Sequence, residues 1–271
     1  CGTDIVGVCT KKQSNFNSDF ADLTPLCKNA KIPIKYVKNI NDEESIDWIK
    51  KLKPDLIFCF GWSFLIKEEL LSVPSLGVIG YHPAELPKNR GRHPLIWALF
   101  LGLKSTASTF FFMDAGADTG DILSQVKVDI EQDDAKSLYD KITKVALSQI
   151  EKFIPELKSG SYCREKQDHS LANSWRKRGQ LDGKIDFRMS SRAIHRLVKS
   201  LTKPYVGAHV KWKDEDIKIW NTEEVEYKLD NIEPGKILSV ENNGITVKTY
   251  DSAIMLTKHD FKVMPSVGEY L

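Results

Sequence analysis

The sequence predicts an α/β fold with a Rossmann-like, mostly parallel sheet, followed by a small antiparallel β domain. Up to residue 203, unbroken apolar runs are separated by helical segments, which is typical of a parallel sheet covered on both faces. After Pro204, short apolar runs alternate with turn signals such as Pro234-Gly235. We therefore expect one domain over residues 1–203 and a second, resembling an OB-fold barrel, over residues 204–271.

Size and composition restrict the classes of protein to consider. With 271 residues and a net charge of +2, the chain is long enough for two domains and has no general excess of positive charge for a polyanionic partner. Its five cysteines are widely spread without a CxxC pair, which favours reduced thiols in a cytoplasmic protein and argues against a zinc site. No signal peptide and no apolar run of membrane-spanning length is visible.

The first half of the larger domain alternates strands and helices. Residues 45–52 carry apolar side chains at helical spacing, with acidic residues before them and lysines at the end, and Pro54 stops the helix. The expected strands are 4–10, 34–37, 55–60 and 76–80, the expected helices are 22–30 and 45–52, and a polar loop covers 11–19. Trp62 and His82 follow two of these strands, and ligands of parallel sheets bind outside such carboxyl ends.

The remaining elements follow from the same patterns. The segment 94–102 starts with proline and ends with glycine, and 134–159 is a long amphipathic helix. Further helices and strands of the larger domain are expected at 190–201, 106–113 and 122–128, with a polar linker over about 160–189. The strands expected in the second domain are 217–220, 236–240, 245–248 and 253–256.

Two polar residues are the main candidates for chemistry. His82 lies in a proline-containing loop after a strand, and Asp118 lies in a tight loop 36 positions later. One apolar helix and one apolar strand separate them, and such a unit can return the second loop to the side of the first. His82 and Asp118 can then face one pocket, which is the arrangement that general acid–base chemistry needs.

With these residues in view, the chain resembles the folate-dependent formyltransferases. That family includes methionyl-tRNA formyltransferase, glycinamide ribonucleotide formyltransferase and the sugar N-formyltransferases. The resemblance covers most of the chain, and its strength comes from several short motifs in one order. These are Phe60-Gly61-Trp62-Ser63, His82-Pro83-x-x-Leu86-Pro87-x-x-Arg90-Gly91, Asp118-Thr119-Gly120-Asp121-Ile122-Leu123, Asp182-Gly183-x-Ile185-Asp186-Phe187 and Pro204-Tyr205-x-Gly207-Ala208.

The resemblance implies transfer of a formyl group from 10-formyltetrahydrofolate to an amine. It makes His82 and Asp118 two of the family's three polar catalytic residues, with His82 donating to the oxyanion and Asp118 helping the amine proton to leave. The third residue of the family, an Asn two places before the His, is Gly80 here. We expect a substitute donor, with Asn89, His93 and backbone amides as candidates; the alternative is a divergent or weak enzyme.

The resemblance also implies the binding residues. For the folate these are Trp62, Ser63, Phe64, Leu65, Leu86, Pro87, Arg90, Gly91, Met113, Ala115, Gly116 and Ala117. For the acceptor they are Ser14, Asn15, Phe16, Asn17 and Ser18, with Lys88 and Arg92 near its phosphates, which suit guanidinium groups. Plainer interpretations stay open: Trp62 as a core aromatic, residues 86–91 as loop shape, and the basic residues as a solvated run.

The acceptor class is open between several members of the family. From Tyr205 onward there are eight Lys and no Arg against twelve Asp plus Glu, which counts against tRNA. We expect a nucleotide-linked amino sugar, a 4-amino-4,6-dideoxy hexose on UDP or dTDP used in surface or flagellar glycan. The alternatives are methionyl-tRNA formyltransferase, a 10-formyltetrahydrofolate hydrolase and a folate-binding protein without turnover. No membrane or nucleic-acid partner is expected, and the second domain either packs on the first or forms a homodimer.

The start of the chain departs from the family pattern. The family normally has a further strand, a glycine turn and a helix before the strand at residues 4–10, and they are absent here. A missing central strand leaves an open gap in the sheet. We expect that the sequence begins inside the natural protein.

Overall fold

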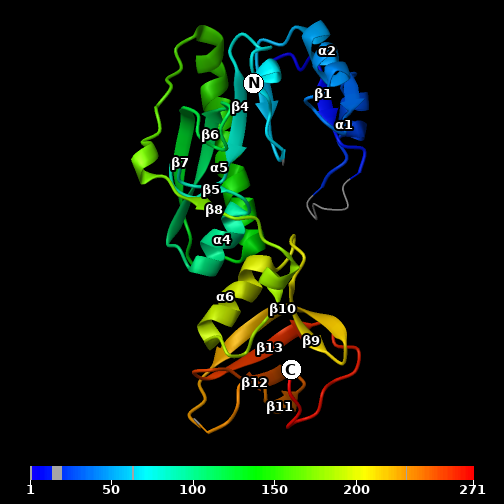
Figure 1. Ribbon diagram of the computed structural model, residues 1–271, viewed down its shortest axis with the longest axis vertical. Helices are drawn as coiled ribbons and strands as arrows, with labels where there is room; N and C mark the ends of the chain where they lie inside the picture. The colour runs from blue at the N-terminus through cyan, green and yellow to red at the C-terminus, as the bar shows by residue number, and fades with distance from the viewer. Residues whose placement is uncertain (1, 14–19, 63, 230) are drawn as a thin grey trace. The chain divides into compact units, whose positions relative to one another are not determined.

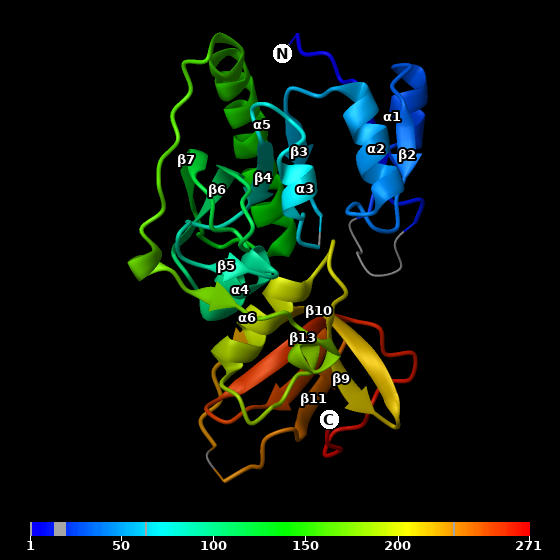
Figure 2. The ribbon, with the colours of Figure 1, turned by 45° about the horizontal axis from the view of Figure 1, so that its top comes forward.

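The computed structural model describes residues 2–13, 20–62, 64–229 and 231–271. The chain divides into two compact units, whose elements are labelled in Figures 1 and 2. The first unit comprises Cys1–Pro94, Ala107–Val128 and Ile142–Trp175, and the second comprises Leu95–Thr106, Asp129–Lys141 and Arg176–Leu271. The single domain boundary near residue 204 stays a prediction.

A four-stranded sheet in the order β3-β4-β6-β7 forms the centre of the first unit (Figure 1). β3 (Ile57–Cys59) and β4 (Val78–His82) are parallel, whereas β6 (Ser105–Phe112) is antiparallel to β4; β7 (Ile122–Asp129) is the last strand. Because side chains alternate along a strand, Val78, Gly80 and His82 share one face. His82 ends β4, as the sequence predicted for a site at a strand terminus.

Helix α5 (Ala135–Ser159) supplies the apolar cover for one face of this sheet. The part of α5 from Ile142 onward belongs to the first unit. It contributes three side chains at helical spacing to a cluster that β4 and β6 complete. The fully or nearly buried members of this cluster are Phe153, Ile154 and Leu157 of α5 with Ile79, Phe110 and Phe112 of the sheet.

The first residues of the unit form a separate parallel pair. β1 (Val8–Thr10) pairs with β2 (Ile34–Tyr36), and α1 (Thr24–Asn29) lies between them in the chain. α2 (Glu43–Leu52) follows, and the Asp42 carboxylate caps it by accepting the Ser45 N–H at 2.7 Å. Within the described residues β1 pairs with β2 and not with β3.

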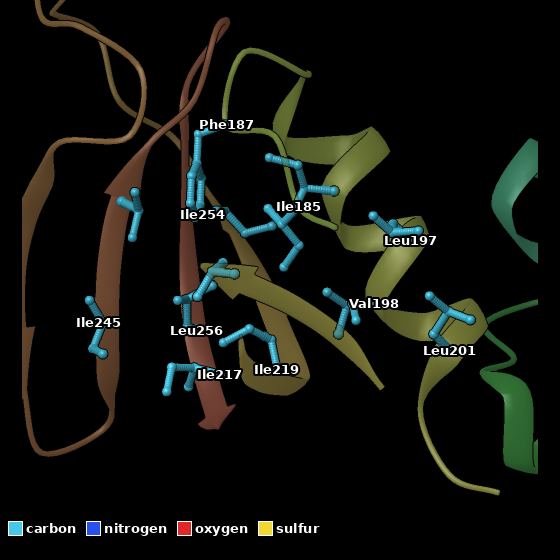
Figure 3. Close-up of a cluster of buried hydrophobic side chains, with 14 of the residues drawn as sticks. Ile185, Phe187, Leu197, Val198, Leu201, Ile217, Ile219, Ile245, Ile254 and Leu256 are labelled. Atoms are coloured by element: carbon cyan, nitrogen blue, oxygen red, sulfur yellow. The ribbon is translucent and has the colours of Figure 1, made fainter. Parts of the chain in front are cut away.

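The second unit contains a five-stranded antiparallel sheet in the order β11-β12-β13-β10-β9. Helix α6 (Ser191–Leu201) packs on it, and Figure 3 shows Val198 of the helix facing Ile219 of the sheet. The small antiparallel β domain is confirmed, but the described sheet is open, because β9 and β11 end it without pairing with each other. The strands are β9 (Ala208–Trp212), β10 (Glu215–Val225), β11 (Ile237–Glu241), β12 (Gly244–Lys248) and β13 (Ala253–His259).

Several short elements have no counterpart in the sequence prediction. They are α3 (Glu68–Leu71), β9, and the parallel pair of β5 (Arg90–Gly91) with β8 (Ser174–Trp175). Strands of two residues carry no periodicity, so only tertiary pairing reveals them. The longer predicted helices, including α4 (Pro94–Leu101), are present to within two residues at each end. Among the described residues, no helix is both long and apolar enough to cross a lipid bilayer.

Candidate active site

His82 is held at the end of β4 with both ring nitrogens facing protein atoms. Its side chain is buried, and Nε2 lies 2.8 Å from the carbonyl oxygen of Asn89. A carbonyl only accepts hydrogen bonds, so Nε2 is the protonated nitrogen that donates to it. Nδ1 is then the nitrogen left to face the neighbouring acidic loop.

Asp118 lies on that acidic loop, between β6 and β7. Its Oδ2 is 3.7 Å from His82 Nδ1 and accepts the Gly91 N–H at 2.9 Å. The residue has a φ of 57°, in the left-handed region that Asp tolerates better than most residues. The structure therefore brings together the two residues that the sequence selected from separate loops.

The two groups differ in their access to solvent. The His82 side chain is 6% exposed and the Asp118 side chain is 22% exposed. Asp118 is therefore the more exposed member of the pair, while His82 is nearly buried and its Nε2 is already engaged. A proton taken up at Nδ1 would give an imidazolium beside a carboxylate, which is a favourable pair. This pair can exchange a proton with a bound molecule once the ring or the loop adjusts, as catalytic groups often do on binding.

Residue 80, where the family has an asparagine, has little room for a side chain in this protein. A Cβ atom on Gly80 would lie 2.9 Å from Phe111 Cζ and 3.0 Å from Met113 Cγ. Phe111 and Met113 thus occupy the space in which a side chain at position 80 would start. Asn89 was one of the expected substitute donors. Both of its backbone groups are already hydrogen-bonded: its N–H donates to Asn173 Oδ1 at 2.7 Å, and its carbonyl accepts from His82. Whether its half-buried side-chain amide replaces the missing donor stays a prediction.

The loop from Leu86 to Gly91 is built mainly by internal contacts. Leu86 is buried with Phe111 in a small apolar cluster, and the Leu86-Pro87 peptide is cis. Arg90 is also buried and donates from Nε and Nη2 to Gln167 Oε1, at 3.2 and 2.6 Å. These contacts support the plainer interpretation of Leu86 and Arg90, in which their side chains shape the loop.

Gly91 has a φ of 100°, and a Cβ there would lie 2.3 Å from the carbonyl oxygen of Trp175. Only glycine fits this combination of backbone angle and close approach. The residue is therefore needed for the geometry that presents its N–H to Asp118.

The other residues expected around the folate range from half-buried to exposed. Trp62 and Met113 pack against the same buried cluster, which includes Val78. Phe64 and Leu65 are 60% and 58% exposed. Ala115 and Ala117 are exposed and Gly116 is half-buried. Ser63 lies outside the described residues.

Most residues expected to bind the acceptor are not described. Ser14, Asn15, Phe16, Asn17 and Ser18 all lie outside the described residues. Lys88 is exposed and Arg92 is half-buried on the loop that follows β4. Over the described ranges, no group of three or more His, Cys, Asp and Glu side chains could hold a metal ion.

Sequence reasoning missed the polar linker as part of this region. Gln167 and Asn173 from that linker contact the His82 and Asp118 loops. The signal was absent because isolated polar residues in a loop-rich stretch have no periodicity and no motif. Only the fold places them beside residues about 50 to 80 positions away.

Two family models match the chain. A model described as formyl transferase matches residues 2–153, and a model described as formyl transferase, C-terminal domain, matches residues 179–267. Among curated relatives, the chain is 30% identical to methionyl-tRNA formyltransferase of Clostridioides difficile, over 99% of this chain and 88% of the relative. It is 38% identical to the bifunctional polymyxin resistance protein ArnA of Wigglesworthia glossinidia brevipalpis, over 71% of this chain but only 30% of that protein.

Solved structures share the fold at lower identity. HypX from Aquifex aeolicus in complex with tetrahydrofolic acid matches with a TM-score of 0.68 and 18% identity, over 93% of this chain and 43% of that one. WlaRD, a sugar 3N-formyl transferase solved with dTDP and 5-N-formyl-THF, matches with a TM-score of 0.61 and 20% identity, over 94% and 98% of the two chains. With two family models that together span most of its length, the chain belongs to the formyl transferase family.

Proposed function

We propose that the protein transfers a formyl group from 10-formyltetrahydrofolate to an amine. The observation that carries this proposal is the His82–Asp118 pair at 3.7 Å, on two loops of a formyl transferase fold. The new bond joins the amine nitrogen to the formyl carbon, and the bond from that carbon to N10 of the folate breaks. The proton that the amine loses is balanced by the proton that N10 gains.

Asp118 and His82 divide the proton work in this proposal. Asp118, the more exposed group, accepts the amine proton, and the Gly91 N–H holds its carboxylate in place. His82 is the more buried group, and it stabilises the Asp118 carboxylate only as an imidazolium, with Nδ1 protonated as well as Nε2. Because Gly80 supplies no side-chain donor, stabilisation of the oxyanion falls to His82 after a ring adjustment or to another amide of the loop.

The residues present fit a folate. Its flat pterin needs apolar surfaces and backbone hydrogen bonds, and the exposed Phe64 and Leu65 beside Trp62 supply the first. Trp62 Nε1 is buried and has no hydrogen-bond partner in the described part of the chain. For the second, the candidates are the backbone groups of residues 114–117, of which Asp114, Ala115 and Ala117 are exposed residues. Two proteins of the same fold, HypX and WlaRD, were solved with tetrahydrofolic acid and 5-N-formyl-THF.

For the acceptor we propose a nucleotide-linked amino sugar. The antiparallel sheet region from Tyr205 onward has eight lysines against twelve acidic residues, so it does not offer a polyanion a positive surface. The sugar 3N-formyl transferase WlaRD covers almost the same length of fold. Lys88 and Arg92, on the loop after β4, suit the phosphates of a nucleotide sugar.

Methionyl-tRNA is the second candidate, and two observations favour it. One curated relative that matches along 88% of its own length is a methionyl-tRNA formyltransferase. In addition, residues 176–203, which belong to the second unit, carry nine Lys and Arg against two acidic residues. Counted from residue 176, the second unit is no longer acidic, which weakens the charge argument made from residue 205 alone.

The test compares both acceptors in one assay. Purified protein is incubated with 10-formyltetrahydrofolate and either UDP- and dTDP-linked 4-amino-4,6-dideoxy sugars or initiator methionyl-tRNA. Mass spectrometry then detects the gain of one formyl group. Formylation of a nucleotide sugar alone supports the proposal, whereas formylation of the tRNA alone selects the second candidate. Formate release without an acceptor would identify a hydrolase.

A further inference from the structure

The linker segment that follows α5 touches both loops of the candidate active site. Glu165 exchanges two backbone hydrogen bonds with Ile122 at the start of β7, at 2.8 and 2.9 Å. Further along, Asn173 accepts the Arg90 N–H through its carbonyl, at 3.0 Å. Gln167 lies between these two anchors, and all of these residues belong to the first unit.

The side-chain amide of Gln167 joins the two loops directly. Its Oε1 accepts from Arg90 Nε and Nη2, while its Nε2 donates to the carbonyl oxygens of Asp118 and Gly120, at 3.0 and 2.6 Å. Gln167 and Arg90 are each 7% exposed. The amide therefore uses its oxygen on one loop and both of its N–H groups on the other.

The chemistry of these partners leaves little choice of side chain. A guanidinium only donates and a carbonyl only accepts, so the bridging group must accept on one side and donate on the other. Glutamine has both functions in one planar group. A glutamate keeps the acceptor for Arg90 but places an oxygen against two carbonyls, and a leucine has neither function. A buried group left without its partner loses hydrogen-bonding free energy.

The hydrogen bonds of the Gln167 side chain, called the Gln167 bridge below, join the loops that carry the two candidate catalytic groups. Arg90 precedes Gly91, whose N–H holds Asp118 Oδ2, and the Asp118 carbonyl takes one Gln167 N–H. Asp118 also has a φ of 57°, which surrounding contacts must maintain. We propose that Gln167 is a positioning residue that fixes the Asp118 carboxylate against His82 by joining the two loops.

Two experiments test the role of Gln167. The first measures kinetics and rests on the proposed formyl transfer, whereas the second measures hydrogen exchange and rests on the geometry alone. In the kinetic arm, Gln167→Leu should lower kcat about 100-fold, because small misplacements of catalytic groups have effects of that order. The KM values for both substrates should stay within about 3-fold, since the Gln167 amide is buried and bonded to protein groups only. Gln149→Leu is the matched control, because Gln149 is a buried amide of the same unit that bonds to Ser108 and Ser124 instead. It should leave kcat unchanged.

The second arm measures hydrogen exchange of the Gly91 amide by NMR, which needs no activity. Loss of the bridge should free this amide from Asp118 and raise its exchange about 10-fold or more in Gln167→Leu, but not in Gln149→Leu. If Gln167→Leu fails to fold, Gln167→Glu, which keeps the Arg90 acceptor, should show the same two changes. Unchanged exchange, or a wild-type kcat in either folded variant, overturns the proposal. A wild-type protein that formylates no amine overturns the proposed function instead, and the exchange result still decides the role of Gln167.

Discussion

The core of the second unit and the loops around His82 are specified in different ways. The core contains Ile219, Ile245, Ile254 and Leu256, all fully buried, on strands that alternate apolar and other residues. The loops around His82 contain buried polar groups, such as Arg90, that bond to residues distant in sequence. Local pattern is sufficient for the first region, whereas the second depends on individual hydrogen bonds across the chain.

This difference determines how substitutions should act. A change in the apolar core should lower the stability of folding and leave the chemistry of folded molecules intact. A change in the loops should alter catalysis more than stability, because each polar contact there holds one group in one place. The following substitutions would sharpen or break this comparison.

The largest effect is expected at Asp118. Asp118→Asn keeps the shape of the side chain but removes the charge beside His82 and the acceptor for the amine proton. We expect kcat to fall about 10³-fold with little change in the unfolding midpoint, because general base catalysis contributes effects of this size. Steady-state kinetics with urea unfolding measures both. A wild-type kcat would remove Asp118 from the mechanism.

A core substitution should show the opposite pattern. Ile254 is fully buried in β13 at the centre of the second unit's cluster (Figure 3). Ile254→Ala should lower the free energy of unfolding by about 2–5 kcal/mol, from lost burial and the cavity that remains. Activity per folded molecule, measured well below the melting temperature, should stay within about 3-fold of wild type. A large loss of kcat at full folding would contradict the separation of the two regions.

Gly80 belongs to both regions of the comparison, because it packs against apolar side chains and lies two residues before His82. Gly80→Asn restores the family's amide but drives a Cβ against the Phe111 ring and Met113. We expect a loss of about 1–3 kcal/mol in stability, as for other overpacked sites. Adding Phe111→Leu should recover part of this loss and allow the new amide to reach the site. If Gly80→Asn alone were as stable as wild type, the position would not be closed as described.

A smaller effect is expected at the start of α2. The Asp42 carboxylate accepts the Ser45 N–H and caps the helix. Asp42→Ala should lower stability by about 1 kcal/mol and leave kcat unchanged, since loss of an N-cap has this typical size. Asp42→Asn serves as the control, because asparagine also caps helices and should retain most of the stability. Equal stability of Asp42→Ala and wild type would show that the cap contributes nothing.

The smallest expected effect is the pH dependence of stability that arises from histidines of the second unit. Burial lowers the pKa of His195, His209 and His259 below the ordinary value, because it disfavours the charged imidazolium. The unfolded state then binds protons more readily than the folded state. The free energy of unfolding is therefore fully retained above pH about 6.5 and decreases as the pH falls below that value. Urea unfolding at pH 7.5 and 5.5 should show the decrease. His209→Gln should reduce the pH dependence, and an unchanged slope would exclude His209 as a contributor.

The fold was largely predictable because its signals are local. Uninterrupted apolar runs predicted β4 and β6, and helical spacing predicted α2 and α5. The two-residue strands β5 and β8 were not predictable, since their pairing joins Arg90 to Ser174 across the chain. The open form of the second sheet depends on whether its two edge strands pair with each other, and the sequence of a single strand does not encode that pairing.

The candidate site was predictable only in part. His82 and Asp118 could be selected because His82 is followed by Pro83 and Asp118 lies two positions before Gly120, each within a recognisable motif. The closing of position 80 depends on the register that sets Gly80 opposite Phe111, and no local pattern encodes it. Gln167 was missed for the same reason, because its importance comes from partners 47 to 77 positions away.

The central claim is that His82 and Asp118 act as one unit in formyl transfer. A double-mutant cycle with His82→Ala, Asp118→Asn and the double variant tests it most directly, with kcat for formyl transfer as the measured quantity. Each single variant should lose about 10³-fold, and the double variant should lose at most about 10-fold more, because residues that act together are not additive. Losses that multiply to about 10⁶-fold, or a single variant with wild-type kcat, would contradict the claim.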